Sequence, residues 1–478
     1  MLMPFSTASS SRFSPSPPMR SHSVCSVLVS PSGSSRMNFT GTTGGPCASS
    51  LCFMCIGRDP LVEPGLRSFG AGLPAASNDS RLMASLPENE DRRRDTLTGS
   101  SFRPDTMQAP TPQHPDPLGC TAEDYVTAAV ESRAVGRGSA RAAYRRFHRD
   151  GEVTDGDRST VHPIGRREIE GETIKFTLTL PGDLETESVL IPMRRRDGTV
   201  TRTLCVSSQI GCAMGCRFCE TAQMGLLRNL ETADIVAQWH AAAHRIGHRP
   251  KNIVFMGMGE PTDNLDAVIP AIRVLADHDG PAVPASNISV STVGNPDGIR
   301  RLGDLAAEPG FHRLNLAVSL NAPNDAIRAE IMPVDRAWPM DDLMDAMLGW
   351  PGRPKSAICV EYVLIPGVND GLEHCDEVCA YLRPLRCSLN VIPYNPRRDS
   401  PWPAPAESSV DAFIGRAIEN GQFTKRRGTK GRDVMAACGQ LGNPEIRRRR
   451  RVDTGDLVPM TFRGDGRSGK SVGVAPSA

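Results

Sequence analysis

Three cysteines whose spacing suits metal chemistry stand close together, at Cys212, Cys216 and Cys219. Structural zinc sites usually take four protein ligands, and these three cysteines have no convincing fourth partner. Three thiolates on a [4Fe–4S] cluster leave one iron without a protein ligand, free to bind another molecule. The spacing therefore favours an iron–sulfur cluster, with Cys212, Cys216 and Cys219 as its metal ligands.

Glycines and small polar residues end the apolar runs that follow this motif. Gly259 and Glu260 end one run, where glycine permits close backbone approach and the carboxylate can accept a hydrogen bond from a ligand ammonium group. Each such segment alone is typical of an ordinary strand-to-helix turn. Together and in this order they predict one cofactor-binding rim, formed by Gly259, Glu260, Ser291, Ser319, Leu320, Asn321 and Asn395.

Apolar runs of strand length alternate with helical stretches through this part of the chain. The runs cover residues 204–207, 253–256, 288–293, 314–320, 358–365 and 389–394, and the helical stretches include 231–243, 265–276 and 370–382. Strands that are apolar throughout and alternate with helices form parallel βα units, which predicts an α/β fold. Six units predict a partial (β/α)6 barrel rather than a closed eight-stranded one.

The remaining sequence divides into segments of different composition. Residues 1–115 are predicted to be a disordered leader, either an early start codon or an organelle transit peptide, because the first 60 residues are rich in serine and contain a single acidic residue, Asp59. Residues 116–195 predict a short, mostly helical accessory segment and a β-hairpin with strands over 173–180 and 188–193. Residues 196–442 are expected to form the barrel and the C-terminal cysteine segment. Residues 443–478 predict a basic, disordered tail.

Composition excludes some classes of function. The chain has 478 residues, a net charge of +1, 14 cysteines and 5% aromatic residues. No run approaches the roughly 18 apolar residues of a membrane-spanning helix. Few aromatic residues argue against a surface that stacks single-stranded nucleic acid. A long, cysteine-rich chain without a disulfide framework favours a reducing compartment, and we expect the cytoplasm.

Basic residues concentrate near the C-terminus. They are Lys425, Arg426, Arg427, Lys430, Arg432 and Arg447–Arg451. Such a cluster can neutralise phosphates of a nucleic acid, and a solvated surface or tail is the alternative interpretation.

Several segments resemble the RlmN/Cfr family of radical S-adenosylmethionine RNA (adenine) methyltransferases. The similarity extends over about residues 170–442 and includes the segments 203–219, 221–230, 256–261, 321–325 and 436–441. Among these, Met-Gly-Met-Gly-Glu-Pro at 256–261 and Ala-Ala-Cys-Gly-Gln-Leu at 436–441 match motifs of the family. The pair Cys205 and Cys438 separates this family from other radical enzymes.

The resemblance implies a [4Fe–4S] cluster and S-adenosylmethionine as cofactors, with reductive cleavage of the latter giving a carbon radical. It implies that Cys438 is the residue that becomes methylated and that Cys205 later forms a disulfide with it. It implies Glu187 as the catalytic base. Glu185 is the alternative, because the spacing from Glu187 to Cys205 is longer than the family pattern.

The expected reaction is methylation of C2 of an adenosine in 23S rRNA with two S-adenosylmethionine molecules per turnover, and transfer RNA is an open second substrate. Thiolate reactivity requires a lowered pKa, which the basic neighbours Lys430 and Arg432 can supply to Cys438. The alternatives are methylation of C8 of the same base, as in antibiotic resistance, and a non-catalytic iron–sulfur or zinc RNA-binding protein. We expect a one-electron donor such as flavodoxin or ferredoxin as a partner, no membrane, and a monomer.

Overall fold

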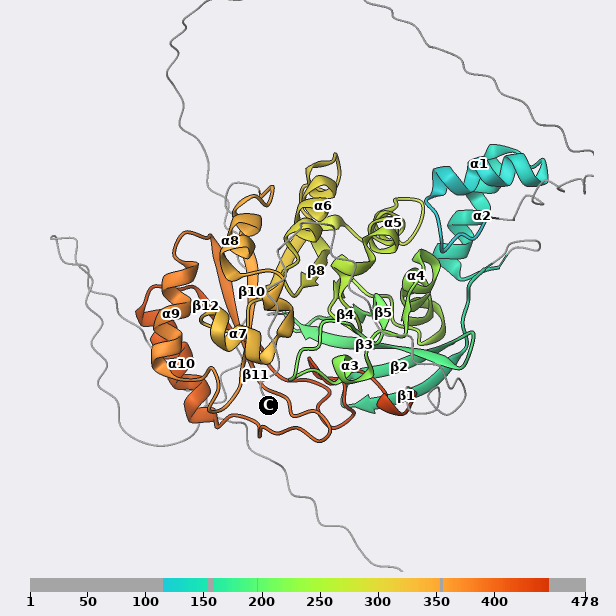
Figure 1. Cartoon of the computed structure of the whole chain (residues 1–478). Coiled ribbons are helices and arrows are strands. Elements are labelled where there is room, and N and C mark those ends of the chain that lie inside the picture. The colour runs from blue at the N-terminus through green and yellow to red at the C-terminus, as the bar shows by residue number, and fades with distance from the viewer. Residues whose placement is uncertain (1–114, 154–158, 196, 353–355, 447–478) are drawn as a thin grey trace, which may run out of the picture. The chain divides into compact units, whose positions relative to one another are not determined.

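The computed structural model describes residues 115–153, 159–195, 197–352 and 356–446 (Figure 1). The predicted leader therefore lies outside the described residues, except for residue 115, and so does the predicted tail beyond residue 446. Within the described chain, no helix is long and apolar enough to cross a membrane.

One 10-stranded sheet forms the centre of the fold, and its strands run in the order β1-β2-β3-β4-β7-β8-β9-β10-β11-β12. The strands from β1 to β4 pair antiparallel, and those from β4 to β12 pair parallel. These strands are β1 (Ile164–Glu170), β2 (Thr173–Leu180), β3 (Leu184–Arg194), β4 (Val200–Val206), β7 (Asn252–Phe255), β8 (Ile288–Thr292), β9 (Asn315–Ser319), β10 (Ile358–Leu364), β11 (Cys387–Pro393) and β12 (Thr424–Arg426). A separate two-stranded sheet joins β5 (Gln209–Ile210) and β6 (Arg228–Asn229). The predicted α/β fold with a partial barrel is confirmed, because β4 and β7–β11 are the six expected parallel strands.

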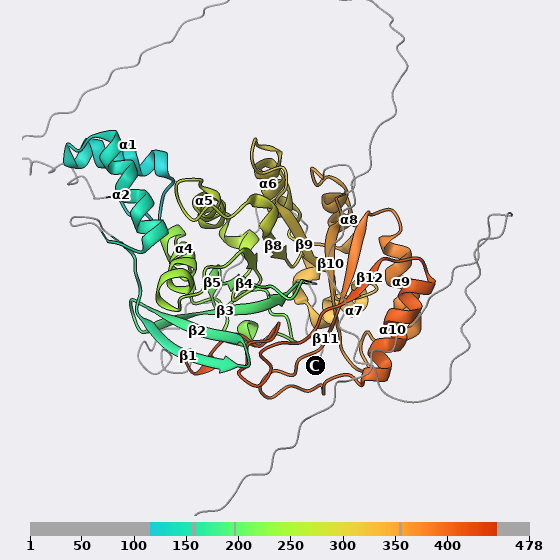
Figure 2. The ribbon, with the colours of Figure 1, turned by 180° about the vertical axis from the view of Figure 1, so that it is seen from behind.

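Helices cover the outer side of the parallel strands, as Figures 1 and 2 show for α4, α5, α6, α8, α9 and α10. The helices are α1 (Ala122–Arg133), α2 (Arg137–Asp150), α3 (Glu220–Met224), α4 (Thr232–His240), α5 (Leu265–Ala276), α6 (Pro296–Ala307), α7 (Asp325–Ile331), α8 (Met340–Leu348), α9 (Leu372–Leu382) and α10 (Glu407–Glu419). The helix predicted over 231–243 continues beyond α4 as a π-helix, η1 (Ala241–Arg245). The short 3₁₀ helices are η2 (Pro261–Asn264), η3 (Ala285–Asn287) and η4 (Pro333–Arg336).

The two faces of the parallel strands differ in polarity. Side chains such as Val360 and Tyr362 of β10 point outward and pack with the helices in the apolar core. Because successive strand residues point to opposite faces, Glu361 between them points inward. Ser291, Ser319 and Glu361 all line a cavity inside the barrel. The runs that looked apolar throughout in the sequence therefore present polar groups on their inner face.

The N-terminal part of the fold joins the same sheet. Residues 164–170, which fell in the mostly helical part predicted before residue 173, form the polar edge strand β1. Charged residues are common on edge strands because they discourage pairing with other chains, and this polarity hid the strand in the sequence. The predicted domain boundary at 195/196 falls in the turn between β3 and β4, and the sheet continues across it.

A buried arginine ties the ends of two central strands together. Arg328 of α7 is 1% exposed and donates hydrogen bonds to the carbonyls of Leu320 and Val293, which follow β9 and β8. The same guanidinium forms an ion pair with Asp335, whose side chain is 4% exposed. Removing one partner of a buried ion pair leaves an uncompensated buried charge.

We predict that Arg328→Met lowers the free energy of unfolding by about 3–5 kcal/mol, because Asp335 then remains buried without its counter-ion. Urea denaturation followed by circular dichroism measures the change. Arg301→Met is the matched control, since Arg301 pairs with Asp266 at 2.7 Å on the surface and such pairs contribute about 0–1 kcal/mol. Equal losses in the two variants would contradict the structural importance of Arg328.

Candidate functional site

A cavity opens at the carboxyl ends of the parallel strands. This is where small-molecule sites of barrels built from parallel strands lie. Of the residues predicted from the sequence, those that line it are Cys205, Cys212, Cys216, Cys219, Gly259, Glu260, Ser291, Ser319, Asn321, Asn395 and Cys438. The predicted residues Leu320 and Glu187 do not line it.

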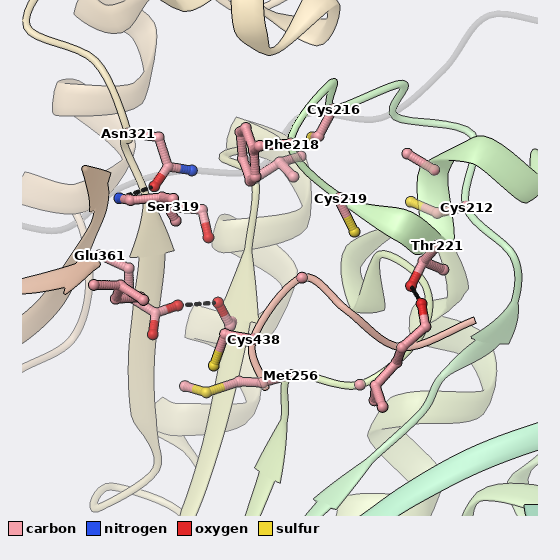
Figure 3. A pocket seen from close by; sticks show the side chains of 18 of the residues that line it. Cys212, Cys216, Phe218, Cys219, Thr221, Met256, Ser319, Asn321, Glu361 and Cys438 are labelled. Carbon is pink, nitrogen blue, oxygen red and sulfur yellow. Dashed lines mark hydrogen bonds between the residues drawn. The ribbon is translucent and has the colours of Figure 1, made fainter. Parts of the chain in front are cut away.

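The loop with the three closely spaced cysteines lies between β5 and α3. Gly211 precedes it with φ of +76°, and a Cβ there would come within 1.8 Å of the Gly225 carbonyl oxygen, so only glycine fits this turn. Cys212 then donates its backbone N–H to that same carbonyl. The loop geometry therefore turns its thiols toward the cavity, where Figure 3 shows them apart from Cys438.

The chemistry of the three thiols fits an iron–sulfur cluster. Burial raises the pKa values of Cys212, Cys216 and Cys219, so each of these groups is a neutral thiol near pH 7 unless a cation compensates. Iron supplies such charge, because a coordinated thiol is deprotonated outright. In the described chain, no three His, Cys, Asp or Glu side chains converge on the position of a single metal ion.

The turn after β7 is fastened to its neighbours by Glu260. One carboxylate oxygen accepts from the Thr262 backbone N–H at 3.0 Å and from its hydroxyl at 2.6 Å, and the other accepts from the Val293 N–H at 2.9 Å. Burial raises the pKa of Glu260. A Cβ on Gly259 would lie 2.5 Å from Gln209 Cβ, so this glycine is required by close packing against protein as well as by any ligand. The turn is thus rigid before a cofactor binds.

The ends of β8, β9 and β10 are linked across the cavity wall. Asn321, with φ of +58°, accepts at its side-chain oxygen from the Val363 N–H at 2.9 Å. Ser291 donates its hydroxyl to Glu361 at 2.9 Å. These polar groups have protein partners and still face the cavity, so the wall can offer remaining lone pairs to a ligand.

Two predicted site residues lie elsewhere. Leu320 points outward into the apolar core, because it follows the inward-facing Ser319 in the strand alternation. Glu187 is 2% exposed on β3, and its carboxylate is 3.2 Å from the Lys175 ammonium and 3.7 Å from the Arg166 guanidinium. The alternative, Glu185, pairs with Arg166 at 2.7 Å and is also absent from the cavity wall.

Residues 430–442, which we call the C-terminal strap, carry Cys438 and lie against strands β1–β3 in both views (Figures 1 and 2). The carboxylate of Glu170 on β1 accepts from the backbone N–H groups of Gly431 at 3.0 Å and Asp433 at 2.7 Å. On β2, Lys175 donates to the carbonyls of residues 434 and 435. Glu187 on β3 accepts from the Gly442 N–H at 2.9 Å. Each of the three antiparallel strands β1, β2 and β3 therefore holds a different part of the strap.

The other side of the strap is held by the segment that follows the cysteine loop. The backbone N–H of Glu220 donates to the Gly439 carbonyl at 2.7 Å, and the Thr221 hydroxyl donates to the Leu441 carbonyl at 2.6 Å. Both contacts are made just after Cys438, so the same helix that begins after Cys219 holds the strap next to its cysteine.

The basic residues at 425–432 have partners within the protein. Arg426 pairs with Glu407 at 2.6 Å, and Lys425 lies over the Phe423 ring. Lys430 donates to the Pro192 carbonyl, and Arg432 donates to the side chain of Asn395 at 3.2 Å. These side chains therefore already make contacts within the protein, and phosphate binding by the cluster stays a prediction.

The basic neighbour of the two lone cysteines is Arg427. Cys205 is 7% exposed at the end of β4, and burial together with nearby Cys438 raises its pKa to about 12. Arg427 and a hydrogen bond from the Met256 backbone act in the opposite direction. Arg427 itself is ion-paired with Glu361 of β10. Arg427 lines the cavity, whereas Lys430 and Arg432, which the sequence suggested as the positive neighbours of Cys438, are absent from its wall.

Glu361 and Arg427 line the cavity, and the sequence analysis did not single them out. A signal for Glu361 was present, because a lone carboxylate inside an otherwise apolar strand is costly unless it is paired. Arg427 gave no separate signal, since it stood among other basic residues whose surroundings the sequence does not reveal.

Comparisons with known proteins show the family of this chain. Residues 206–378 match the Radical SAM superfamily. "Probable dual-specificity RNA methyltransferase RlmN 1" of Protochlamydia amoebophila is 38% identical over 350 residues, which cover 70% of this chain and 95% of the relative. "Dual-specificity RNA methyltransferase RlmN" of Nitratidesulfovibrio vulgaris (strain DSM 19637 / Miyazaki F) is 41% identical over 280 residues, 57% of this chain and 75% of the relative.

Among solved structures, a radical SAM methyltransferase from Sphaerobacter thermophilus superposes with a TM-score of 0.62 and 34% sequence identity, covering 68% of this chain and 98% of that one. The identity to the Protochlamydia protein extends over nearly its whole length, so the similarity is not limited to the shared barrel. The chain therefore belongs to the RlmN family of radical S-adenosylmethionine RNA methyltransferases.

Proposed function

We propose that this protein methylates C2 of an adenosine in 23S rRNA, with Cys438 carrying the methyl group and Cys205 releasing the product. The observation that carries the proposal is that Cys205 from β4 and Cys438 from the strap line one cavity together with Cys212, Cys216 and Cys219. Two further thiols beside a cluster-binding loop have no use in a radical enzyme that only cleaves its cofactor.

The cysteine loop is proposed to hold a [4Fe–4S] cluster through Cys212, Cys216 and Cys219, and the rim with Gly259, Glu260, Ser291, Ser319, Asn321 and Asn395 to hold S-adenosylmethionine. Together these cofactors, when bound, supply methyl groups and the electron-driven radical chemistry that an electrophilic ring carbon requires. Leu320 packs its side chain in the core, so its proposed part in holding the cofactor is through its backbone. The rigid turns around the cavity keep these groups in position before binding, which lowers the entropic cost of the reaction.

Product release is a thiol–disulfide step between the two lone cysteines. The Cys205 thiolate attacks the Cys438 sulfur, an S–S bond forms, and the bond from that sulfur to the transferred carbon breaks. The electron pair left on the carbon takes up a proton, which balances the proton that Cys205 lost. The step needs no external oxidant.

Glu187 is proposed as the base that removes the ring proton. In this conformation it is covered by the strap through Gly442 and paired with Lys175. A base must come within hydrogen-bond distance of its proton, although catalytic contacts often form only in the substrate complex. The proposal therefore requires the end of the strap to shift from Glu187 when RNA binds.

The relatives are named as dual-specificity enzymes, and we extend this to the present chain with 23S rRNA and transfer RNA as its two substrates. We further propose a flavodoxin or ferredoxin as electron donor and a monomer that acts in the cytoplasm. Mass spectrometry of digested RNA distinguishes 2-methyladenosine from 8-methyladenosine, and detection of the latter alone would overturn the C2 assignment.

Replacing any one cysteine of the triad by alanine should abolish cluster binding and reductive cleavage of S-adenosylmethionine. The three thiols are the only ligands proposed for the cluster, so the loss of one leaves a second iron open. Iron content, visible absorbance and 5′-deoxyadenosine release measure the effect after anaerobic reconstitution. Cys387→Ala is the control, because Cys387 is a buried cysteine at the opposite end of a barrel strand. Full cofactor cleavage by a Cys216→Ala enzyme would disprove the ligand assignment.

The two lone cysteines should fail differently when they are replaced. Cys438→Ala should carry no methyl group and form no RNA adduct, because the carbon that joins the base has no attachment point. Cys205→Ala should still load the methyl and join RNA covalently, and then stop, because release needs a second thiolate.

Gel electrophoresis before and after nuclease treatment detects the trapped adduct, and intact-protein mass spectrometry detects the methyl group. Cys120→Ala, in the N-terminal segment, serves as the control and should trap nothing. If the Cys205 and Cys438 variants behave alike and neither traps RNA, the covalent mechanism does not apply to this protein.

A further inference from the structure

We propose that Arg427, held in the cavity by Glu361, is a positioning residue that stabilises the thiolate of Cys205 for the release step. The inference rests on the proposed function, in which Cys205 must act as a thiolate. It adds a residue that the chemistry of the cysteines alone does not assign.

Ionising the Cys205 thiol is costly because the thiol is buried. A thiol whose pKa is raised to about 12 by burial is almost entirely protonated near pH 7, whereas the attacking species in disulfide formation is the thiolate. The strand neighbours paired with Cys205, Val189 of β3 and Val254 of β7, carry no charge. A positive group must therefore come from another element.

Arg427 is that group. Among the described residues that line the cavity, it is the only basic side chain. The charged or titratable groups that face Cys205 are Cys438 from the strap, Glu361 from β10 and Arg427 itself. Cys438 and Glu361 both disfavour a negative charge on Cys205. Arg427 and the backbone N–H of Met256 favour it, and Arg427 is the charged group of these two.

The position of Arg427 is fixed from several sides. Its backbone N–H donates to the Val391 carbonyl at 2.8 Å, which continues the pairing of β12 with β11. Its guanidinium pairs with Glu361, which is held in turn by Ser291, and also contacts the Met256 sulfur at 3.5 Å. A guanidinium held in this way is preorganised and remains charged at any physiological pH. The neighbouring Arg426 pairs with Glu407 and Asp411 instead and faces a different set of acids.

Glu361 makes this arrangement electrically balanced. An unpaired guanidinium in a buried cavity would be costly, and an unpaired carboxylate beside two thiols would oppose their ionisation. The two groups are less costly to bury as an ion pair than singly. Arg427 also lies close enough to both thiols that a negative charge on Cys438 or on Cys205 raises the pKa of Arg427. Pairing with Glu361 thus keeps the positive charge of Arg427 beside Cys205, where the release step forms and consumes a thiolate.

The test is the pH dependence of Cys205 alkylation in the full-length, reduced protein with its cluster in place. Iodoacetamide is added between pH 7 and pH 10, and site-resolved mass spectrometry follows Cys205. Arg427→Gln should react about tenfold more slowly than the parent at each pH, which corresponds to a pKa raised by one unit. Arg427→Lys should recover most of the rate, because it restores the positive charge. Arg426→Gln is the matched control and should react at the parental rate.

An alkylation rate for Arg427→Gln that equals or exceeds that of the parent would overturn the proposal. If the role of Arg427 were merely structural, its removal would loosen the cavity and expose the Cys205 thiol. A second measurement uses the reaction itself. In a single turnover, Arg427→Gln should accumulate the RNA adduct that Cys205→Ala traps, with slower release that recovers as the pH rises. Absence of any adduct in Cys205→Ala would overturn the proposed function, while the alkylation result would still decide the role of Arg427.

Discussion

Docking of the C-terminal strap against the antiparallel strands β1–β3 is the interaction on which the site depends. Glu170, Lys175 and Glu187 each bind backbone groups of the strap. Backbone groups that leave water need such partners, and these three side chains supply them at intervals along the segment. Without strands β1–β3, the strap would keep only its contacts on the barrel side, such as those of Gly439 with Glu220 and of Leu441 with Thr221. Strands β1–β3 and the barrel strands belong to one continuous sheet, and both parts hold the strap.

The polarity of the barrel interior follows from its helical cover. Outward side chains such as Tyr362 pack with Phe413 of α10 at a ring separation of 5.2 Å, so apolar burial is concentrated between the strands and the helices. The inner face of the barrel does not pack against helices and need not be apolar. It can carry serines, asparagines, cysteines and one ion pair, and these are the groups that a polar cofactor and a thiol-based reaction require.

Burial has opposite consequences for the two kinds of cysteine in the cavity. At Cys212, Cys216 and Cys219 it raises the pKa values, and the iron–sulfur cluster proposed for these thiols would compensate for this effect. At Cys205 no metal is proposed, and a fixed guanidinium takes that role. The same desolvation that protects reactive sulfur from solvent thus demands a nearby positive charge in both places.

The sequence by itself determined the partial barrel, the cysteine triad and the family, because strand–helix alternation and short motifs are local patterns. Five of the six central strands lie within two residues of their predicted ends, and β4 begins four residues before its predicted start. The edge strand β1 was missed because its burial is slight and its residues are polar. The tertiary structure alone decided that Leu320 points away from the cavity and that Glu187 lies under the strap. It also decided that Arg427, rather than Lys430 or Arg432, stands beside the lone thiols. These positions depend on pairing between segments far apart in the chain, and no local pattern encodes which partner a charged side chain meets.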